Sequence, residues 1–293
     1  MSMIVLLAQG SNLKAGIFFN ALFRAMRWIK PRDGAPVPEI CPSPPNLRIV
    51  ADNAPMTHRP APGLRLNAVA LGALIFASPA LSPANATDAC APPPASTLVV
   101  NVRDKGAKGD GQTDDTAAIQ AAIDAIGGTK GTVLVPKGIY MIDAVEHRLH
   151  LKDDMTLKLA DGAVLKAIPN DAEKYSLLTI SRAANVWVIG GTLEGERDQH
   201  MGKSGQWGYG LRINKGAKHI TVSGVVSKKM WGDGFYVQDA EDVRFCGVTA
   251  DANRRQGLSV IQVDGLLVLN SVFKNTHGTR PEAGIDFEPD RVE

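Results

Sequence analysis

Cysteine is scarce in this chain, which has only Cys41, Cys90 and Cys246 among its 293 residues. None of them belongs to a CxxC pair or to a cluster with histidine, so the spacing typical of a zinc site is missing. Cys41 lies in the part of the chain that we expect to be removed. A disulfide between Cys90 and Cys246 is chemically allowed in an exported protein, and two free thiols are the equal alternative.

An excess of charge of one sign is also missing from most of the chain. Residues 87–293 hold 24 basic and 27 acidic residues, whereas residues 1–86 hold 8 basic and 3 acidic ones. The small basic excess of the whole sequence therefore belongs to its N-terminal part. Nucleic-acid binding by the remainder is not indicated.

The apolar run Leu66–Ala77 has 12 residues, too few for a permanent membrane span. A short basic segment beginning at Met56 precedes it, and Ala84-Asn85-Ala86 follows with the A-x-A pattern of a cleavage site. This layout predicts a signal peptide over residues 56–86, a mature chain beginning at Thr87, and a secreted or periplasmic protein. A buried helix of the fold is the alternative interpretation.

The segments on either side of this leader are expected to lie outside the folded domain. Residues 1–55 are weakly amphipathic at first and then proline-rich from Pro31 to Pro45. We expect them to be a spurious extension from an upstream start codon, with a membrane-surface helix as the alternative. Residues 87–98, which include Pro92–Pro94, are predicted to be a flexible lead-in.

The chain does contain two interleaved repeats. One has a glycine followed by an apolar residue at the first and third positions, and its glycines lie 24, 23 and 27 residues apart. Its four copies are Gly210–Ile213, Gly234–Val237, Gly257–Val260 and Gly284–Phe287. The other repeat pairs apolar residues two apart, and its copies begin at Val186, Ile220, Val243 and Leu266. Two staggered ladders with a period near 23 predict a parallel β-solenoid with one strand of each ladder in every coil.

The solenoid is expected to begin at Val99 and to be capped by a helix. Ile119, Ile123 and Ile126 lie on one helical face, a residue among Thr113–Asp115 can cap its N-terminus, and Gly127 ends it. Strands are expected over residues 131–136 and 139–142. The helix should cover the first coil, because an open solenoid end exposes apolar core and an unpaired strand edge.

The runs VRDKGAKGDGQTDDTAAIQAAIDA and GTVLVPKGIYMI, between residues 99 and 142, resemble the opening of the pectate-lyase-like parallel β-helix superfamily. That superfamily includes polygalacturonases, rhamnogalacturonases, mannuronan C5-epimerases, exo-glucanases and phage tailspikes. The resemblance implies an all-β fold, a right-handed parallel β-helix over residues 99–293 with a short N-terminal capping α-helix. It also implies that the partner is a polysaccharide. Because no capping element follows Pro289, we expect the domain to be truncated at its C-terminus.

Strand alternation predicts which side chains face outward from the glycine ladder. They form one polar column beside aromatic residues, and the 34-residue interval between Val186 and Ile220 inserts a loop next to it. Charged outward residues on a solenoid are ordinarily only solvated surface. Both signs of charge, the aromatic residues and the inserted loop favour a glycan-binding groove here instead. The candidate substrate-binding residues are Arg212, Trp207, Tyr209 and Trp231, and the candidate catalytic residues are Asp233, Tyr236, Arg254, Arg255, Asp286 and Glu288.

These residue types fit two kinds of chemistry. A lyase removes the C5 proton of a uronate, and it needs a base and cations, roles that Tyr236, Arg254 and Arg255 can fill. Asp233, Asp286 and Glu288 could hold a Ca²⁺ ion, the one cofactor that the sequence suggests. A hydrolase needs two carboxylates about 5 to 9.5 Å apart, and Asp233 can pair with Asp286 or Glu288 two coils away.

The specific motifs of the resembled families are incomplete. Polygalacturonases carry N-T-D-G, G-D-D and G-H-G segments in successive coils, and only the Asp233-Gly234 dipeptide of the first is present. Mannuronan epimerases carry Y-G-F-D-P-H, which corresponds to Asp233–Gln238, so Tyr236 and Gln238 replace the aspartate and the histidine. The preceding segment Thr192–Asp198 is similar to their T-L-D-G-N-R-D.

The sequence therefore predicts a secreted protein that acts on a polysaccharide, with a uronate lyase as the first hypothesis. A glycoside hydrolase or a C5-epimerase on the same scaffold is the second hypothesis, and a non-catalytic glycan-binding or adhesive solenoid is the third. Because Asp286 and Arg255 are predicted to face solvent, replacing either should change stability by only about 0.5 kcal/mol.

Overall fold

A computed structural model describes residues 90–288 of the chain. The predicted extension over residues 1–55 and the predicted signal peptide over residues 56–86 lie outside the described residues. So do the first residues of the lead-in and the last five residues of the chain. Within the described part, no helix has both the length and the apolar character needed to cross a membrane.

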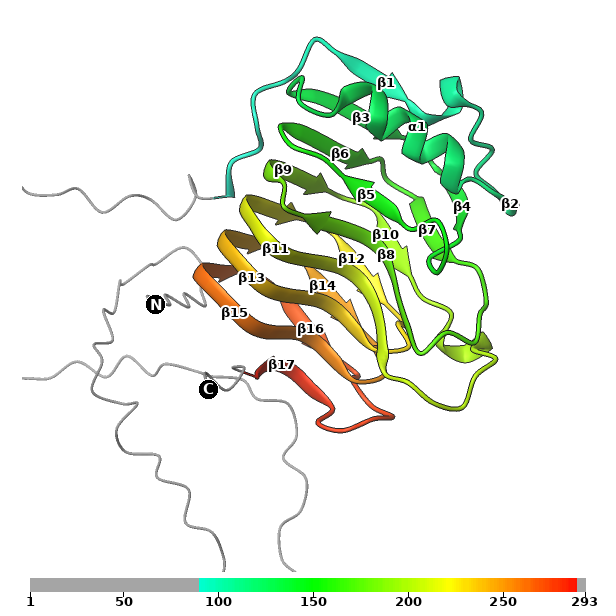
Figure 1. Cartoon of the computed structure of the whole chain (residues 1–293), viewed down its shortest axis with the longest axis vertical. Coiled ribbons are helices and arrows are strands. Elements are labelled where there is room, and N and C mark those ends of the chain that lie inside the picture. Colours follow the sequence, from blue (N-terminus) through cyan, green and yellow to red (C-terminus); the bar gives the residue numbers. More distant parts are fainter. Residues whose placement is uncertain (1–89, 289–293) are drawn as a thin grey trace, which may run out of the picture. The chain divides into compact units, whose positions relative to one another are not determined.

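The described residues form a right-handed parallel β-helix, as the sequence predicted, and Figure 1 shows its coils stacked along one axis. Three faces run along that axis. The first face comprises β5 (Leu149–Leu151), β8 (Lys174–Ser181), the first halves of β11 (Trp207–Ser223), β13 (Asp233–Cys246) and β15 (Gln256–Leu269), and β17 (Ala283–Phe287). The second face comprises β1 (Val99–Asn101), β3 (Gly131–Val135), β6 (Met155–Leu159), β9 (Ala184–Ile189) and the second halves of the three long strands.

The third face is a separate seven-stranded parallel sheet. It comprises β2 (Asp110–Asp114), β4 (Gly138–Ile142), β7 (Ala163–Ala167), β10 (Thr192–Glu194), β12 (Val226–Lys228), β14 (Thr249–Asp251) and β16 (Val272–Lys274). Sequence analysis missed most of this face, because its later strands have only three residues each and carry no repeated glycine. The two ladders that it did find correspond to the first and second faces.

The glycine ladder has a steric cause. A methyl group on Gly210 would lie 2.6 Å from the carbonyl oxygen of Gly234, and one on Gly234 would lie 2.8 Å from that of Gly257. A methyl group on Gly257 would collide in the same way with Gly284. Real Cβ atoms do not approach other atoms so closely, so β11, β13 and β15 each require a residue without a side chain at this position of the first face. The glycine repeat is therefore a consequence of the close stacking of successive coils.

The capping helix α1 (Thr116–Ile126) lies at the N-terminal end of the β-helix, as predicted (Figure 1). Its apolar stripe is fully buried and packs on β1, β3, β5 and the 3-10 helix η3 (Val102–Lys105). Gly127 ends it, but the N-cap residue Asp115 makes no capping hydrogen bond with its side chain. The Asp115 carboxylate instead accepts hydrogen bonds from the amides of Lys108 and Gly109, at 2.6 and 3.0 Å. This fixes the preceding loop against the helix.

A disulfide joins Cys90 to Cys246, with 5.9 Å between the two Cα atoms and 156 positions between them in the sequence. The sequence left the pairing open, and the structure decides it. Cys246 lies at the end of β13 and is nearly buried. The predicted lead-in is thus tied covalently to the second face of the β-helix, several coils away from β1.

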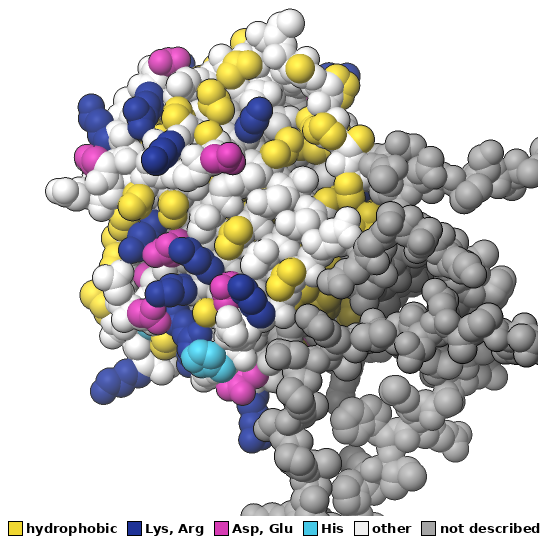
Figure 2. Space-filling model, turned by 180° about the vertical axis from the view of Figure 1, so that it is seen from behind, with side chains coloured by type: hydrophobic (Ala, Val, Ile, Leu, Met, Phe, Trp, Pro, Cys, Tyr) yellow, Lys and Arg dark blue, Asp and Glu magenta, His cyan; other side chains and the backbone are white. Residues whose placement is uncertain are grey.

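The third face carries an ionic ladder on its outer side. One side chain from each of five adjacent strands takes part, and their charges alternate in sign: Lys166, Glu194, Lys228, Asp251 and Lys274. Glu194 lies 3.4 Å from Lys166 and 2.9 Å from Lys228, and Lys274 lies 3.5 Å from Asp251. Figure 2, which shows the side opposite to that of Figure 1, has basic and acidic side chains close together over its lower half.

Candidate functional site

The outward side chains of the first face form two columns that we call the ladder face. Adjacent strands place Thr179, Arg212, Tyr236, Ser259 and Asp286 in register in the first column. Asp233 and Gln256 are in register in the second column, and Glu288 follows directly after β17. The structure therefore brings together most of the predicted site residues, from strands far apart in the sequence, because neighbouring strands of a sheet are only about 4.8 Å apart.

Arg255 lies at the centre of a buried ion-pair network on this face. Its guanidinium donates to the Asp233 carboxylate at 3.0 Å and to both carboxylate oxygens of Glu288, at 2.6 and 2.9 Å. Arg255 is 8% exposed and Asp233 is fully buried. The prediction that Arg255 faces solvent is wrong, because β17 and its carboxylates pack over it. Replacing it leaves two carboxylates without their counter-ion, so we now expect a larger change in stability than the sequence suggested.

Burial raises the pKa of Asp233 to about 7, against the opposing effects of Arg255 and of a 2.7 Å hydrogen bond from Ser259. Gln256 accepts a hydrogen bond from Arg255 at 2.8 Å and donates one to Asp286. Burial and the charge of Glu288 raise the pKa of Asp286. The acidic residues therefore form one connected system, and protonation of Asp233 changes the charge of that system near neutral pH.

Two tyrosines lie beside this network. The rings of Tyr209 and Tyr236 are 4.5 Å apart, and the Arg212 guanidinium lies 5.8 and 5.7 Å from their centroids. Tyr209 is buried, and burial followed by the charge of Asp233 raises its pKa. Tyr236 is only half-buried, and its hydroxyl donates to Gln238 at 3.1 Å. Tyr236 is thus the tyrosine hydroxyl that a substrate on the ladder face can reach.

Positive charge collects at the β8–β11 end of the ladder face. The pKa of Lys174 is lowered by burial and by the nearby charges of Arg212, Arg148 and Lys215. Trp207 pairs with Lys174 in the β8–β11 register and is 40% exposed. An exposed indole beside several cations provides a stacking surface and charge for an anionic sugar.

Trp231 and Arg254 lie in a different environment from the other predicted residues. The His200 ring stacks on Trp231 with 3.8 Å between centroids, and the Arg254 guanidinium lies 3.8 Å from the Trp231 centroid. Two groups at that distance cannot share one side of a ring, so both sides of the indole are covered. Arg254 also donates to the carbonyl oxygen of Gly205 at 3.0 Å. These contacts fix the inserted loop and leave neither side of Trp231 free for a sugar.

A buried group that sequence analysis missed holds the same loop. Glu196 is 1% exposed, and its carboxylate lies 3.1 Å from Nδ1 of His200. Burial raises the pKa of Glu196, opposed by hydrogen bonds with Tyr175 and His200. The amide of Trp231 donates to the Tyr175 hydroxyl at 3.3 Å. Glu196 and His200 are four residues apart, a spacing that did not distinguish them from ordinary surface residues.

The residues suggested for calcium do not fit that ion. The Arg255 guanidinium binds both Asp233 and Glu288, so a cation of the protein already lies between these carboxylates. Among residues 90–288, no group of three or more histidine, cysteine, aspartate or glutamate side chains is arranged to hold a metal ion. We therefore derive no step through calcium.

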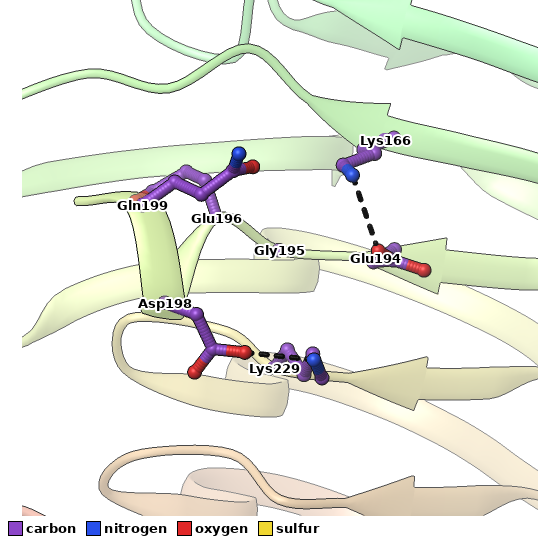
Figure 3. A pocket seen from close by; sticks show the side chains of 7 residues that line it. All are labelled: Lys166, Glu194, Gly195, Glu196, Asp198, Gln199 and Lys229. Carbon is purple, nitrogen blue, oxygen red and sulfur yellow. Dashed lines mark hydrogen bonds and ion pairs between the residues drawn. The ribbon is translucent and has the colours of Figure 1, made fainter. Parts of the chain in front are cut away.

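A pocket of about 280 Å³ lies away from the ladder face, at the end of strands β7, β10 and β12 (Figure 3). Its lining includes Lys166 and Glu194, whose side chains point toward each other, and Asp198 and Lys229, which form an ion pair at 2.7 Å. Each of its charged side chains has a partner in the protein, which for Glu196 is His200 beside the pocket. We therefore favour the ladder face, whose β8–β11 end keeps several cations close together, as the functional site.

Comparison with known families matches residues 99–159 to the model of "Rhamnogalacturonase A/epimerase, pectate lyase-like" proteins. That match covers 61 of the 293 residues, and together with the fold and the solved structures below it supports a place among the pectate-lyase-like parallel β-helix proteins. The resemblance seen in the opening motif is therefore confirmed.

Solved structures with a similar fold include the following two. The A-module of mannuronan C-5 epimerase AlgE4 from Azotobacter vinelandii has a TM-score of 0.55 and 27% identity, over 64% of this chain and 53% of that one. A family 28 exopolygalacturonase from Yersinia enterocolitica has a TM-score of 0.51 and 20% identity, over 65% of this chain and 45% of that one. The second likeness is one of fold alone.

Sequence comparison gives relatives of the same kind. Mannuronan C5-epimerase AlgE4 is 32% identical over 200 residues, which are 55% of this chain and 36% of that protein. The uncharacterized protein YclG of Bacillus subtilis is 28% identical over 224 residues, which are 65% of this chain and 38% of that protein. The chain thus matches less than two fifths of the length of either relative.

Proposed function

We propose that this protein acts on an acidic polysaccharide bound along the ladder face. The observation that carries the proposal is the arrangement of Lys174, Arg212 and the exposed Trp207 at one end of that face, next to the half-buried Tyr236. Cations and an exposed indole suit a carboxylated sugar. The mannuronan epimerases to which the chain is similar support the polysaccharide class.

The reaction that best fits these residues is β-elimination at a uronate. The base takes the C5 proton, the C4–O4 bond breaks, a C4–C5 double bond forms, and a proton returns to the departing O4. We assign the base to Tyr236 in its ionised, phenolate form, because both Arg254 and Arg255 are engaged in contacts with the protein. Arg212 and Lys174 neutralise the uronate carboxylate, which makes the C5 proton more acidic.

A second function is favoured by one observation. Arg255 pairs with two of the three carboxylates on the ladder face, so these groups are already engaged by the protein itself. This arrangement suits a solenoid that binds a glycan without turnover. Hydrolysis and C5-epimerisation remain alternatives on the same scaffold, with Asp233 and Asp286 as the carboxyl pair of a hydrolase.

The test is a panel of acidic polysaccharides incubated with the purified protein, followed by assays for both unsaturated products and new reducing ends. We expect unsaturated products, and we expect Tyr236→Phe to remove them while binding of the polymer persists. New reducing ends without unsaturation would indicate hydrolysis instead. Binding without any product would support the glycan-binding solenoid, and no binding to any polymer would overturn the proposal.

Export is part of the same proposal. A disulfide such as Cys90–Cys246 persists in oxidising compartments and is rare in the cytosol. This bond and the predicted signal peptide support a secreted or periplasmic location. N-terminal sequencing of the exported protein tests it, with Thr87 as the expected first residue.

A further inference from the structure

The inserted loop, residues 195–206 between β10 and β11, is closed over Trp231. The His200 ring of this loop stacks on one side of the indole, with 3.8 Å between the two centroids. The indole Nε1 donates to the carbonyl oxygen of Ser204 in the same loop, at 3.3 Å. The Arg254 guanidinium, which lies outside the loop, covers the other side of the ring. The loop therefore controls access to the side of Trp231 on which His200 lies.

Closing the loop buries a carboxyl group and an imidazole together. The side chains of Glu196 and His200 are 0% and 1% exposed, and the Glu196 carboxylate lies 3.1 Å from Nδ1 of His200. The hydroxyl of Tyr175 on β8 also hydrogen-bonds this carboxylate. Nε2 of His200 is buried without a hydrogen-bond partner. Opening the loop returns both groups to water, which supplies the missing hydrogen bonds, so the closed loop carries a desolvation cost.

The charge that acts on Glu196 is that of His200. Burial raises the pKa of Glu196, while the hydrogen bonds from Tyr175 and His200 and the charge of His200 oppose this effect. The other charged groups of the pocket in Figure 3, which Glu196 also lines, are Lys166, Glu194, Asp198 and Lys229. They are paired with one another. The titratable groups on the remaining sides of the loop are Glu173, Arg197, Arg254 and His277. The proton balance of loop closure therefore depends mainly on Glu196.

We propose that Glu196 is a pH-sensitive lock: the inserted loop stays closed while Glu196 holds a proton, and ionisation of Glu196 opens the loop and uncovers Trp231. In the open loop Glu196 is solvated and has its ordinary pKa of 4.5, whereas burial raises its pKa in the closed loop. Between these two values the closed state holds the extra proton, so rising pH favours opening. The side of the indole that His200 leaves then becomes a stacking surface for a sugar ring. Only this last step rests on the proposed function.

Amide hydrogen exchange of residues 195–206 tests the lock, with rates corrected for the intrinsic effect of pH on exchange. We expect the protection of the loop to be constant below pH 4.5 and then to fall by at most about tenfold per pH unit, as release of one proton requires. Acrylamide quenching of tryptophan fluorescence should rise over the same range, because Trp231 is uncovered. Glu196→Gln keeps an oxygen acceptor for Tyr175 and His200. In this variant neither measurement should depend on pH.

Glu173→Gln is the matched control, because Glu173 is an exposed carboxylate that accepts a hydrogen bond from Ser204 of the same loop, at 2.6 Å. It should keep the pH dependence of the unchanged protein, and melting temperatures check that both variants fold. Loop protection that does not vary with pH in the unchanged protein would overturn the lock, whether or not a variant folds. So would a pH dependence that Glu196→Gln retains. Because no polysaccharide is added, either result leaves the proposed function of the ladder face to its own test.

Discussion

Arg255 is the residue on which the ladder face depends most. It is nearly buried and neutralises Asp233, which is fully buried, as well as Glu288. Arg255→Ala should lower the free energy of unfolding by about 3–5 kcal/mol, because it leaves a buried carboxylate without its partner. Chemical denaturation measures this value. Arg244→Ala is the control, since Arg244 is 37% exposed in its pair with Asp242 and should cost at most about 1 kcal/mol. Equal costs would show that Asp233 is not held by Arg255.

Asp233 should make stability depend on pH near neutrality. Its pKa is about 7 in the folded protein because of burial, above the value of 3.8 for an unperturbed aspartate. Between these values the folded state holds more protons than the unfolded state, so this group lowers stability as pH rises and the loss is complete above pH 7. Asp233→Asn should remove that contribution.

The measurement is the difference in melting temperature between Asp233→Asn and the unchanged protein, taken from pH 5 to pH 8. The variant should gain relative stability as pH rises through this window. Taking the difference cancels the raised pKa of Glu196, which lies outside the network of Asp233 and acts with the same sign. A constant difference across the window would contradict the raised pKa of Asp233.

At the scale of residues, strand alternation predicted the direction of some side chains correctly and failed for others. It placed Arg212, Tyr236 and Asp286 on one outward column, and the structure has them in that register. It could not show that Arg255 is buried, because Arg255 lies at a turn where alternation gives no direction. The cover over Arg255 comes from Glu288, a residue 33 positions later whose contact depends on how the coils stack.

At the scale of elements, the glycine ladder gives a sharp prediction. Gly234→Ala places a methyl group 2.6 Å from the Asn253 side chain and 2.8 Å from the Gly257 carbonyl oxygen. The backbone of two coils must separate to admit it, so we expect a loss of about 1–3 kcal/mol. Gly284→Ala is the matched control within the same ladder. Its methyl group meets Phe273 at 3.3 Å, a contact that a small shift relieves, so its loss should be smaller by denaturant titration.

Sequence periodicity found two of the three faces for a physical reason. The first two faces share strands long enough for apolar residues to alternate, and β11, β13 and β15 each carry an obligatory glycine on the first face. On the third face, β10, β12 and β14 have three residues each, and only the middle side chain is buried. So short a strand shows no detectable alternation of apolar residues. Its alternating charges became visible only once the register was known. The 34-residue interval between Val186 and Ile220 showed where the loop held by Glu196 and His200 lies. It did not show which contacts hold that loop.

At the scale of the whole molecule, the β-helix is held together by the cap over its first coil and by the contacts between successive coils. Helix α1 covers the first coil, and the ladders join each coil to the next. Contacts of this kind are local along the axis, because each coil touches only its neighbours. The disulfide is different, since it joins the lead-in before β1 to the end of β13, across several coils. It therefore restrains the unfolded chain more than any single contact between adjacent coils.

Loss of the Cys90–Cys246 disulfide should destabilise the protein without changing its fold. A loop of more than 100 residues loses enough entropy in the unfolded chain for a stabilisation of about 2–5 kcal/mol. Urea titration with and without a reductant measures it, with thiol counting to confirm that the bond has opened. The Cys90→Ser, Cys246→Ser variant should match the reduced protein and no longer respond to reductant. If full reduction leaves the urea midpoint unchanged, the prediction is wrong. The disulfide would then form in an oxidising compartment without stabilising the fold.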